Sequence, residues 1–350
     1  MKKTSDLRIR FVDPLISPQE LKKKFPLTED SAATVVESRE LIKRILARQE
    51  ERLLAVVGPC SIHDYKAAID YARRLHALNE RIKDRVYILM RVYFEKPRTT
   101  IGWRGMIVDP HLDGSYRISE GLTLARQLLL EITGMGLPAA TEMLDPIVPQ
   151  YVDDLIGWAA IGARTTESQT HRNMVSGLSM PVGFKNGTDG NLQIAIDAMA
   201  SARHPHHFIG IDQEGKTSVL GTTGNTDTHI ILRGSRTTGN YRKPEIVYTG
   251  ELLKEAGFLP AIMVDCSHGN SDKRAERQEE VLRSLLESRA SGCREVIGFM
   301  MESNLSGGRQ DIPRDLSRLK YGVSITDPCL SWEQTEQLLL YAYEQHKVEG

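Results

Sequence analysis

Hydrophobic and polar positions follow two alternating patterns along the chain. Short runs that are almost continuously apolar are separated, in most cases, by longer stretches in which apolar residues recur every three or four positions. The short runs are typical of strands in a parallel sheet covered on both faces, and the longer stretches, such as residues 65–82 and 272–290, predict amphipathic helices. The candidate strands are residues 53–58, 86–93, 137–143, 158–163, 181–186, 207–211, 229–234, 261–268 and 296–303.

One candidate strand lacks the helix that should follow it. Residues 207–224 contain two apolar runs joined by Glu214-Gly215-Lys216, a connection typical of a β-hairpin. Without this insertion eight strands remain, which is the number that closes a TIM barrel. The predicted fold is therefore α/β: a TIM (β/α)8 barrel with an N-terminal extension and an inserted β-hairpin.

The first fifty residues lie outside the barrel pattern. A capping sequence at residues 17–20 predicts the start of one helix, and residues 32–49 predict a second. Residues 6–11 alternate polar with apolar side chains, which favours pairing with another subunit. We therefore predict two units: an extension at 1–50 that serves regulation or oligomerisation, and a catalytic barrel at 51–350 with its hairpin at about 207–224.

The composition of the chain disfavours some classes of binding partner. Lys and Arg number 45 against 46 Asp and Glu, so the 350-residue chain has no basic field to attract nucleic acid or an anionic membrane. The N-terminus lacks an apolar leader, and no apolar run approaches membrane-spanning length. The cysteines are scattered without a CxxC pair, which predicts free thiols and a cytoplasmic location. They are Cys60, Cys266, Cys293 and Cys329.

Polar side chains stand where the predicted strands end. The active site of a TIM barrel lies at the carboxyl ends of its strands. A solvated strand end explains one polar residue easily, but it explains eight poorly. The eight ends lie near Cys60, Arg91, Glu142, Arg164, Lys185, Arg233, His268 and Glu302.

One group of these residues has the chemistry of a metal site. Cys60, His268 and Glu302 come from the first, seventh and eighth strands, which are neighbours in a closed barrel, and Asp327 follows the last strand. Each residue alone has an ordinary structural explanation. Together a thiolate, an imidazole and two carboxylates favour a divalent Mn, Fe, Co or Zn ion over Mg. Cys266 is expected to face the same way as His268 but deeper in the barrel, and it ranks behind Cys60.

A second group is cationic. Six positive side chains converging on one barrel mouth would repel one another if the mouth were empty, so they predict ligands with phosphate and carboxylate groups. Neither a GxxxxGK[ST] loop nor a GxGxxG turn after a strand is present, which disfavours nucleotides. The six are Arg91, Lys96, Arg98, Arg164, Lys185 and Arg233.

Seven segments carry a resemblance to a known family. They are GPCSIHD (58–64), RVYFEKPRTT (91–100), GARTTESQTHR (162–172), PVGFKNGTDG (181–190), HIILRG (229–234), DCSHGNS (265–271) and SITDPC (324–329). The chain resembles the type I 3-deoxy-D-arabino-heptulosonate 7-phosphate (DAHP) synthases, most of all the tyrosine-sensitive isoenzymes. The resemblance implies a TIM barrel, assembly into a homodimer or homotetramer, and the first reaction of the shikimate pathway to the aromatic amino acids. In that reaction phosphoenolpyruvate, D-erythrose 4-phosphate and water give DAHP and phosphate.

The resemblance also implies a role for each site residue. The metal ligands are Cys60, His268, Glu302 and Asp327. The phosphoenolpyruvate site is Arg91, Lys185, Arg164 and Arg233, the last two on the phosphate. Lys96 lies between the substrates, Arg98 and Thr99 bind the phosphate of erythrose 4-phosphate, and Glu142 lies near the enol ether. The catalytic residues are Lys96, His268, Cys60 and Glu142. Glu142 and a metal-linked ligand are both candidates to activate the water.

The same resemblance implies feedback inhibition by tyrosine. The inhibitor site would lie away from the active site, between the barrel wall, the hairpin and a neighbouring subunit's N-terminal arm. Its candidate residues are Pro149, Gln150, Ser179 and Gly210. Gly210 favours tyrosine over phenylalanine because it leaves room for the phenolic oxygen. Two alternatives stay open: the related 3-deoxy-octulosonate 8-phosphate synthase, and a catalytically silent phosphosugar-binding regulator.

Overall fold

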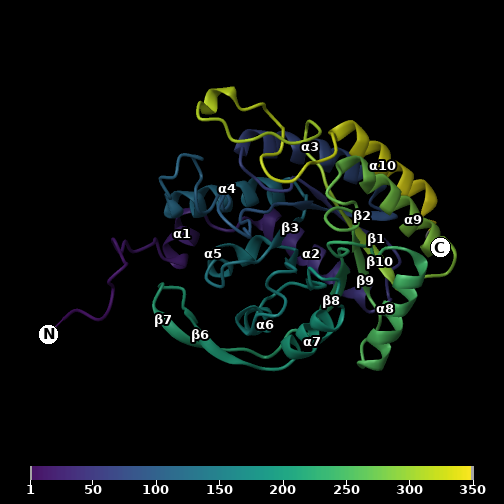
Figure 1. Ribbon diagram of the computed structural model, residues 1–350, viewed down its shortest axis with the longest axis horizontal. Coiled ribbons are helices and arrows are strands. Elements are labelled where there is room, and N and C mark those ends of the chain that lie inside the picture. Colours follow the sequence, from purple (N-terminus) through teal and green to yellow (C-terminus); the bar gives the residue numbers. More distant parts are fainter. Residues whose placement is uncertain (1, 348–350) are drawn as a thin grey trace.

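Eight parallel strands close into a barrel in the computed structural model of the protein, which describes residues 2–347 (Figure 1). The barrel strands are β1 (Leu53–Gly58), β2 (Val86–Arg91), β3 (Ala139–Glu142), β4 (Trp158–Ile161), β5 (Val182–Lys185), β8 (Thr228–Leu232), β9 (Ile262–Asp265) and β10 (Val296–Glu302). Their order is β1-β10-β9-β8-β5-β4-β3-β2, so the first strand pairs with the last. The predicted barrel is confirmed.

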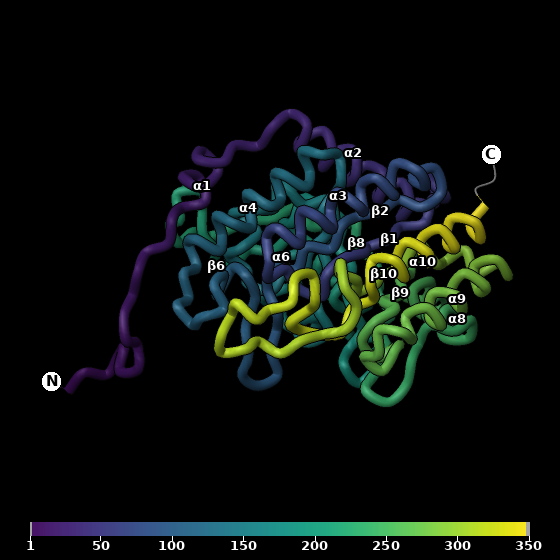
Figure 2. The backbone as a smooth tube through the Cα atoms, turned by 90° about the horizontal axis from the view of Figure 1, so that it is seen from above, coloured from purple at the N-terminus to yellow at the C-terminus, as the bar shows by residue number. Residues whose placement is uncertain are grey.

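Helices surround the barrel and cover its outer face (Figures 1 and 2). They are α1 (Pro18–Lys24), α2 (Glu29–Leu46), α3 (Tyr65–Ile82), α4 (Ile118–Gly134), α5 (Pro149–Val152), α6 (Gln169–Val175), α7 (Gln193–Ala202), α8 (Lys243–Glu255), α9 (Gln278–Ala290) and α10 (Trp332–Gln345). Short 3-10 helices are η1 (Asp153–Leu155), η2 (Ala275–Arg277) and η3 (Leu316–Arg318). None of the helices in residues 2–347 is both long and apolar enough to cross a membrane.

The burial of β1 explains its unbroken apolar sequence. Leu54 and Val56 belong to the hydrophobic cluster inside the barrel. Leu53, Ala55 and Val57 belong to the cluster shared with the surrounding helices. Because alternate side chains face opposite sides of a strand, a strand buried on both faces must be apolar at every position.

Helix α2 contributes side chains to the hydrophobic cluster that fills the barrel. Its residues Leu41, Ile42 and Ile45 share the inner cluster with Leu54 and Trp158. Helix α1 begins with the predicted capping box: the Ser17 side chain accepts from the Glu20 backbone, and the Glu20 side chain accepts from the Ser17 backbone.

Strands β6 (His207–Ile211) and β7 (Thr217–Gly221) form the predicted antiparallel hairpin, outside the barrel. The backbone N–H of Gln19 donates to the Gln213 carbonyl at 2.8 Å, and the Gln213 side chain donates to Gln150 Oε1 at 2.9 Å. These bonds link the hairpin to α1 and α5.

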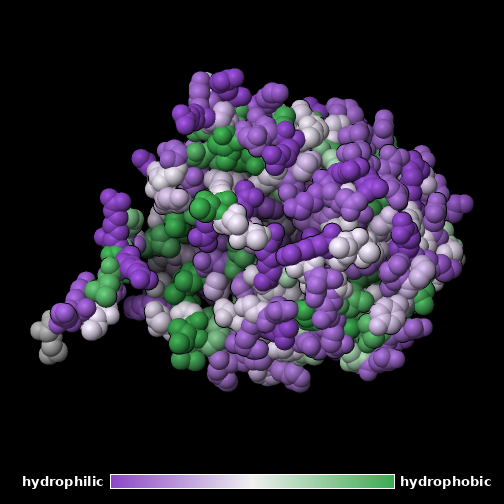
Figure 3. Space-filling view, in the orientation of Figure 1, coloured by the Kyte–Doolittle hydropathy of each residue, from purple (hydrophilic) through white to green (hydrophobic). Residues whose placement is uncertain are grey.

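The N-terminal segment before α1 extends away from the barrel (Figure 2). It carries apolar side chains into solvent (Figure 3). Leu7, Ile9, Phe11 and Val12 are all more than half exposed.

Candidate active site

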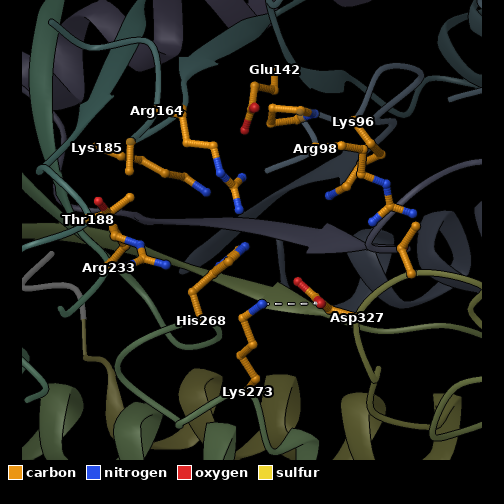
Figure 4. Close-up of a pocket in the computed structure, with 14 residues that line it drawn as sticks. Lys96, Arg98, Glu142, Arg164, Lys185, Thr188, Arg233, His268, Lys273 and Asp327 are labelled. Carbon is orange, nitrogen blue, oxygen red and sulfur yellow. Dashed lines mark ion pairs between the residues drawn. The ribbon is translucent and has the colours of Figure 1, made fainter. Parts of the chain in front are cut away.

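The carboxyl ends of the barrel strands surround one cavity of about 710 Å³, including its open mouth. Figure 4 shows cationic side chains pointing into it from several strands. Its wall is Lys96, Pro97, Arg98, Glu142, Gly162, Ala163, Arg164, Lys185, Thr188, Arg233, His268, Lys273, Thr326 and Asp327. A second cavity, of about 1310 Å³, adjoins it and shares Lys96, Arg98 and Arg164.

A glycine and a proline bring Cys60 to this mouth. A Cβ on Gly58 would lie 2.8 Å from the Arg91 carbonyl oxygen, so only glycine lets β1 approach β2 this closely. Pro59 follows the strand, and its carbonyl accepts from Arg91 Nε at 3.1 Å. Cys60 is therefore fully buried at the end of β1, next to the end of β10.

Three of the four predicted metal ligands lie together. Donor atoms of Cys60, Glu302 and Asp327 are all within 4.8 Å of one another. The fourth, His268, has its Nε2 atom 3.7 Å from Glu302 Oε1. The backbone N–H of Asp327 lies 3.4 Å from the Cys60 sulfur, which holds the loop after β10 against β1.

A buried carboxylate orients His268. Asp265 Oδ2 lies 2.9 Å from His268 Nδ1 and also accepts from Lys185 Nζ at 2.9 Å. Burial acts to raise the pKa of Asp265, but Lys185 and His268 outweigh it and hold the pKa well below its usual range. An ionised Asp265 keeps the proton of His268 on Nδ1, which leaves Nε2 free to bind a metal.

The electrostatics of the cluster favour the binding of a cation. Burial and the neighbouring Glu302 raise the pKa of the Cys60 thiol, because each opposes the thiolate. A divalent ion among these donors would reverse that effect, since a metal deprotonates a coordinating thiol. One soft sulfur with nitrogen and carboxylate oxygens suits a transition metal.

Of the six predicted cations, five line the cavity and one is buried behind its wall. Lys96, Arg98, Arg164, Lys185 and Arg233 line the cavity. Arg91 is fully buried and donates to Glu302 Oε1 at 2.8 Å. Its guanidinium lies 3.7 Å from the centre of the Tyr93 ring, and its Nη1 atom is buried without a partner in the described residues.

The positive charge of Arg164 acts on Arg233, and both residues line the cavity. Burial lowers the pKa of Arg233, and the nearby Arg164 adds to this effect. Two guanidinium groups that repel each other across a cavity wall form a ready site for a phosphate. Lys96 donates to the Cys60 carbonyl at 3.1 Å and lies 3.3 Å from the Cys60 sulfur.

A model of the DAHP synthetase I family matches residues 24–340. The chain belongs to this family. It is 54% identical over 325 residues to the Tyr-sensitive phospho-2-dehydro-3-deoxyheptonate aldolase of Escherichia coli K12, covering 93% of this chain and 91% of that one. The Phe-sensitive enzyme of the same strain is 50% identical over 334 residues, covering 95% of each chain. The solved structure of the Francisella tularensis SCHU S4 enzyme has a TM-score of 0.95 and 46% identity, covering 98% of this chain and 100% of that one.

These comparisons confirm the predicted family, barrel fold and enzyme class. The roles of the individual residues in this DAHP synthase family member remain predictions. The structure also adds residues that the sequence did not single out. Asp265, three positions before His268, could have been found from the sequence because it is an acidic residue at the end of an apolar strand. No sequence pattern marks Thr188, Lys273 or Thr326.

The expectation for Cys266 is wrong. By alternation along β9, Ile262, Val264 and Cys266 all belong to the cluster shared with the surrounding helices. His268 reaches the mouth because its φ of 58° turns the chain out of the strand. Cys266 therefore faces away from the candidate metal ligands.

The four predicted inhibitor residues lie on three segments outside the barrel mouth. Pro149 and Gln150 open α5, Ser179 is exposed before β5, and Gly210 lies in the hairpin. The bond from Gln213 to Gln150 joins the hairpin and α5. A Cβ on Gly210 would lie 2.5 Å from Leu220 Cδ1, so a larger residue there requires Leu220 to move.

Proposed function

We propose that this cavity is the active site in which phosphoenolpyruvate condenses with D-erythrose 4-phosphate. The observation that carries the proposal is the joining of two unlike sites in one mouth: a cluster of candidate metal ligands and a wall of six cations. A reaction between two phosphorylated substrates, one of them an aldehyde, needs both sites. The metal site would polarise the carbonyl, and the cations would bind the phosphate and carboxylate groups.

The metal would be held by Cys60, His268, Glu302 and Asp327. When bound, a divalent ion supplies Lewis-acid polarisation of the aldehyde carbonyl. Arg91 holds Glu302 in place through its 2.8 Å hydrogen bond. Asp265 does the same for His268 through its contact with Nδ1. We expect this ion to be Mn, Fe, Co or Zn.

The substrates would be placed by the cations. Arg164 and Arg233 bind the phosphate of phosphoenolpyruvate, and Lys185 its carboxylate. Arg98 and Thr99 bind the phosphate of erythrose 4-phosphate. Arg98 is braced by a 2.9 Å hydrogen bond from its Nε to the Trp103 carbonyl, which keeps part of the guanidinium free for a ligand.

The reaction forms one carbon–carbon bond. The methylene carbon of phosphoenolpyruvate attacks the aldehyde, and Lys96 donates to the oxygen that becomes negative. Burial opposes the charged form of Lys96, but Cys60 and Glu302 outweigh it and raise its pKa, so the group stays a donor. Water then adds to the central enol carbon. The new hydroxyl group passes its remaining proton to the departing phosphate as the carbon–oxygen bond breaks and the ketone forms. Glu142, which lines the cavity beside Gly162, accepts the proton of that water.

Tyrosine would act as the feedback inhibitor, bound near Pro149, Gln150, Ser179 and Gly210. Support comes from the hydrogen bonds that tie the hairpin to α1 and α5, because a ligand there can act on all three segments. The exposed apolar residues of the N-terminal arm, with Ile209 and Val219 on the hairpin, support contact with a second subunit. We expect a homodimer or homotetramer.

The decisive experiment combines substrate, chelator and one substitution. Phosphate release is measured with erythrose 4-phosphate and with arabinose 5-phosphate, before and after removal of metal. We expect release with erythrose 4-phosphate, its loss with chelator and its recovery on adding a divalent ion. Cys60→Ala should abolish release, whereas Cys293→Ala, another buried free thiol, should not. Preference for arabinose 5-phosphate, or full metal-dependent activity in Cys60→Ala, would contradict the proposal.

A further inference from the structure

Lys273 is a cation of the cavity wall that has no role in the reaction described above. It lies in the loop after β9, and its Nζ is 3.7 Å from Asp327 Oδ1, the ion pair drawn in Figure 4. Asp327 in turn belongs to the cluster of metal-binding donors. Lys273 therefore contacts a carboxylate that a divalent ion also needs.

The backbone of this loop is fixed in an unusual conformation. His268, Asp272 and Lys273 have φ angles of 58°, 51° and 59°. This left-handed region costs a residue with a side chain roughly 1 kcal/mol or more. The Lys273 N–H donates to the His268 carbonyl at 2.8 Å, so the lysine is tied directly to a second candidate ligand. Strain of this kind persists only where the surroundings determine the conformation.

Asn270 anchors the same loop to the barrel. Its side-chain amide donates to the carbonyls of Leu232 and Asp265, at 3.1 and 2.9 Å. These atoms end β8 and β9, so the loop cannot shift without breaking bonds to two strands. The starting point of the Lys273 side chain is thus set relative to the metal cluster.

The ion pair itself is easily exchanged. The side chains of Lys273 and Asp327 are 57% and 32% exposed. Ion pairs that face solvent in this way contribute under about 1 kcal/mol and are screened by salt. A divalent ion with several other donors in reach competes well for the same carboxylate.

We propose that Lys273 competes with the divalent metal for Asp327 and so sets how tightly the centre holds its ion. Without an ion, the ammonium group balances the charge of Asp327. With an ion bound, the same ammonium group lies close to a second positive charge and opposes it. Neutralising Lys273 should therefore tighten metal binding. This proposal rests on the proposed metal centre.

The test measures metal affinity rather than turnover. The full chain is stripped with a chelator and titrated with Mn²⁺ by calorimetry, and with Co²⁺ by the near-ultraviolet absorption of its thiolate bond to Cys60. Lys273→Gln should lower the dissociation constant by about threefold to tenfold at low salt. The gain should shrink at about 0.5 M salt, because the lysine is exposed. Lys273→Arg, which keeps the charge, and Lys216→Gln, at an exposed hairpin lysine, should stay within about twofold of the wild type.

The other possible outcomes distinguish failure of the competition from failure of the metal centre. An unchanged or weaker affinity in Lys273→Gln, with one ion still bound, overturns the competition and leaves the centre standing. A gain that salt does not reduce also overturns it, because the cause is then a rearranged loop. If Cys60→Ala and Asp327→Asn bind the ions as tightly as the wild type, the metal centre itself is wrong.

Discussion

Glu95 is a carboxyl group buried between two other acidic side chains. It follows β2 in the wall of the second cavity and is only 5% exposed. The Asp145 backbone N–H lies 3.4 Å from Glu95 Oε2. Burial, and then the charges of Asp145 and Glu142, raise the pKa of Glu95 from 4.5 to about 8. Glu95 is therefore protonated in the folded protein at neutral pH.

The sign of the effect on stability follows from this shift. The unfolded chain releases the Glu95 proton near pH 4.5, whereas the folded protein keeps it up to about pH 8. As the pH rises through this window, the unfolded state gains an ionised form that the folded state lacks, so the free energy of unfolding falls. The total loss by pH 8 is roughly 4 kcal/mol. Glutamine has the same shape and no charge, so Glu95→Gln should abolish this loss.

Urea denaturation of the wild type and Glu95→Gln, in steps from pH 5 to pH 9, measures the effect. The difference between the two free energies of unfolding should grow steadily up to about pH 8 and then level off. Asp145→Asn is the matched control: it removes the second cause of the shift, so its curve should level off at a lower pH. Parallel curves for wild type and Glu95→Gln would refute the burial argument.

Three further predictions test separate parts of the molecule. Arg233→Lys keeps the charge but loses the planar fork, so the KM for phosphoenolpyruvate should rise about tenfold or more in steady-state assays; an unchanged KM would reject the phosphate contact. Gly210→Ser should weaken inhibition by tyrosine and leave turnover intact; titration with tyrosine, phenylalanine and tryptophan shows whether tyrosine is the strongest inhibitor. Burial lowers the pKa of His229 to about 4, so folding loses stability as the pH falls from 6.5. His229→Gln should flatten that loss in thermal unfolding while still accepting from Trp158 Nε1.

The sequence was sufficient to predict the barrel and the approach of Cys60 to Glu302, two of the candidate metal ligands. Unbroken apolar strands show that both faces are buried, and the closed order puts the ends of β1 and β10 side by side. Cys60 and Glu302 then follow from strand position alone. Asp327 stands well beyond the end of β10 at Glu302, so strand position alone did not place it; the long loop after β10 returns it to β1.

The positions of the other site residues depend on where each strand ends, and the hydrophobic periodicity does not specify those ends. β9 ends at Asp265, and the turn at His268 reverses the expected side of the next residues. The prediction for Cys266 failed for that reason. The same turn brings Lys273 back to Asp327, a contact between positions 54 residues apart that no local pattern contains.

The net charge of the chain does not reveal how charges are distributed at the barrel mouth. The chain carries a formal charge of −1, yet acids and cations both gather at its barrel mouth, where Arg91 pairs with Glu302 and Lys273 with Asp327. Cys60, Glu302 and Asp327 crowd together on one side, and Arg164 and Arg233 face the cavity on another. Within each group like charges repel strongly where water is scarce, and these ion pairs offset part of that repulsion. Folding supplies the energy that holds both groups in place, and binding of a cation to one and of anions to the other relieves the repulsion, so ligand and metal should each raise the stability of the fold.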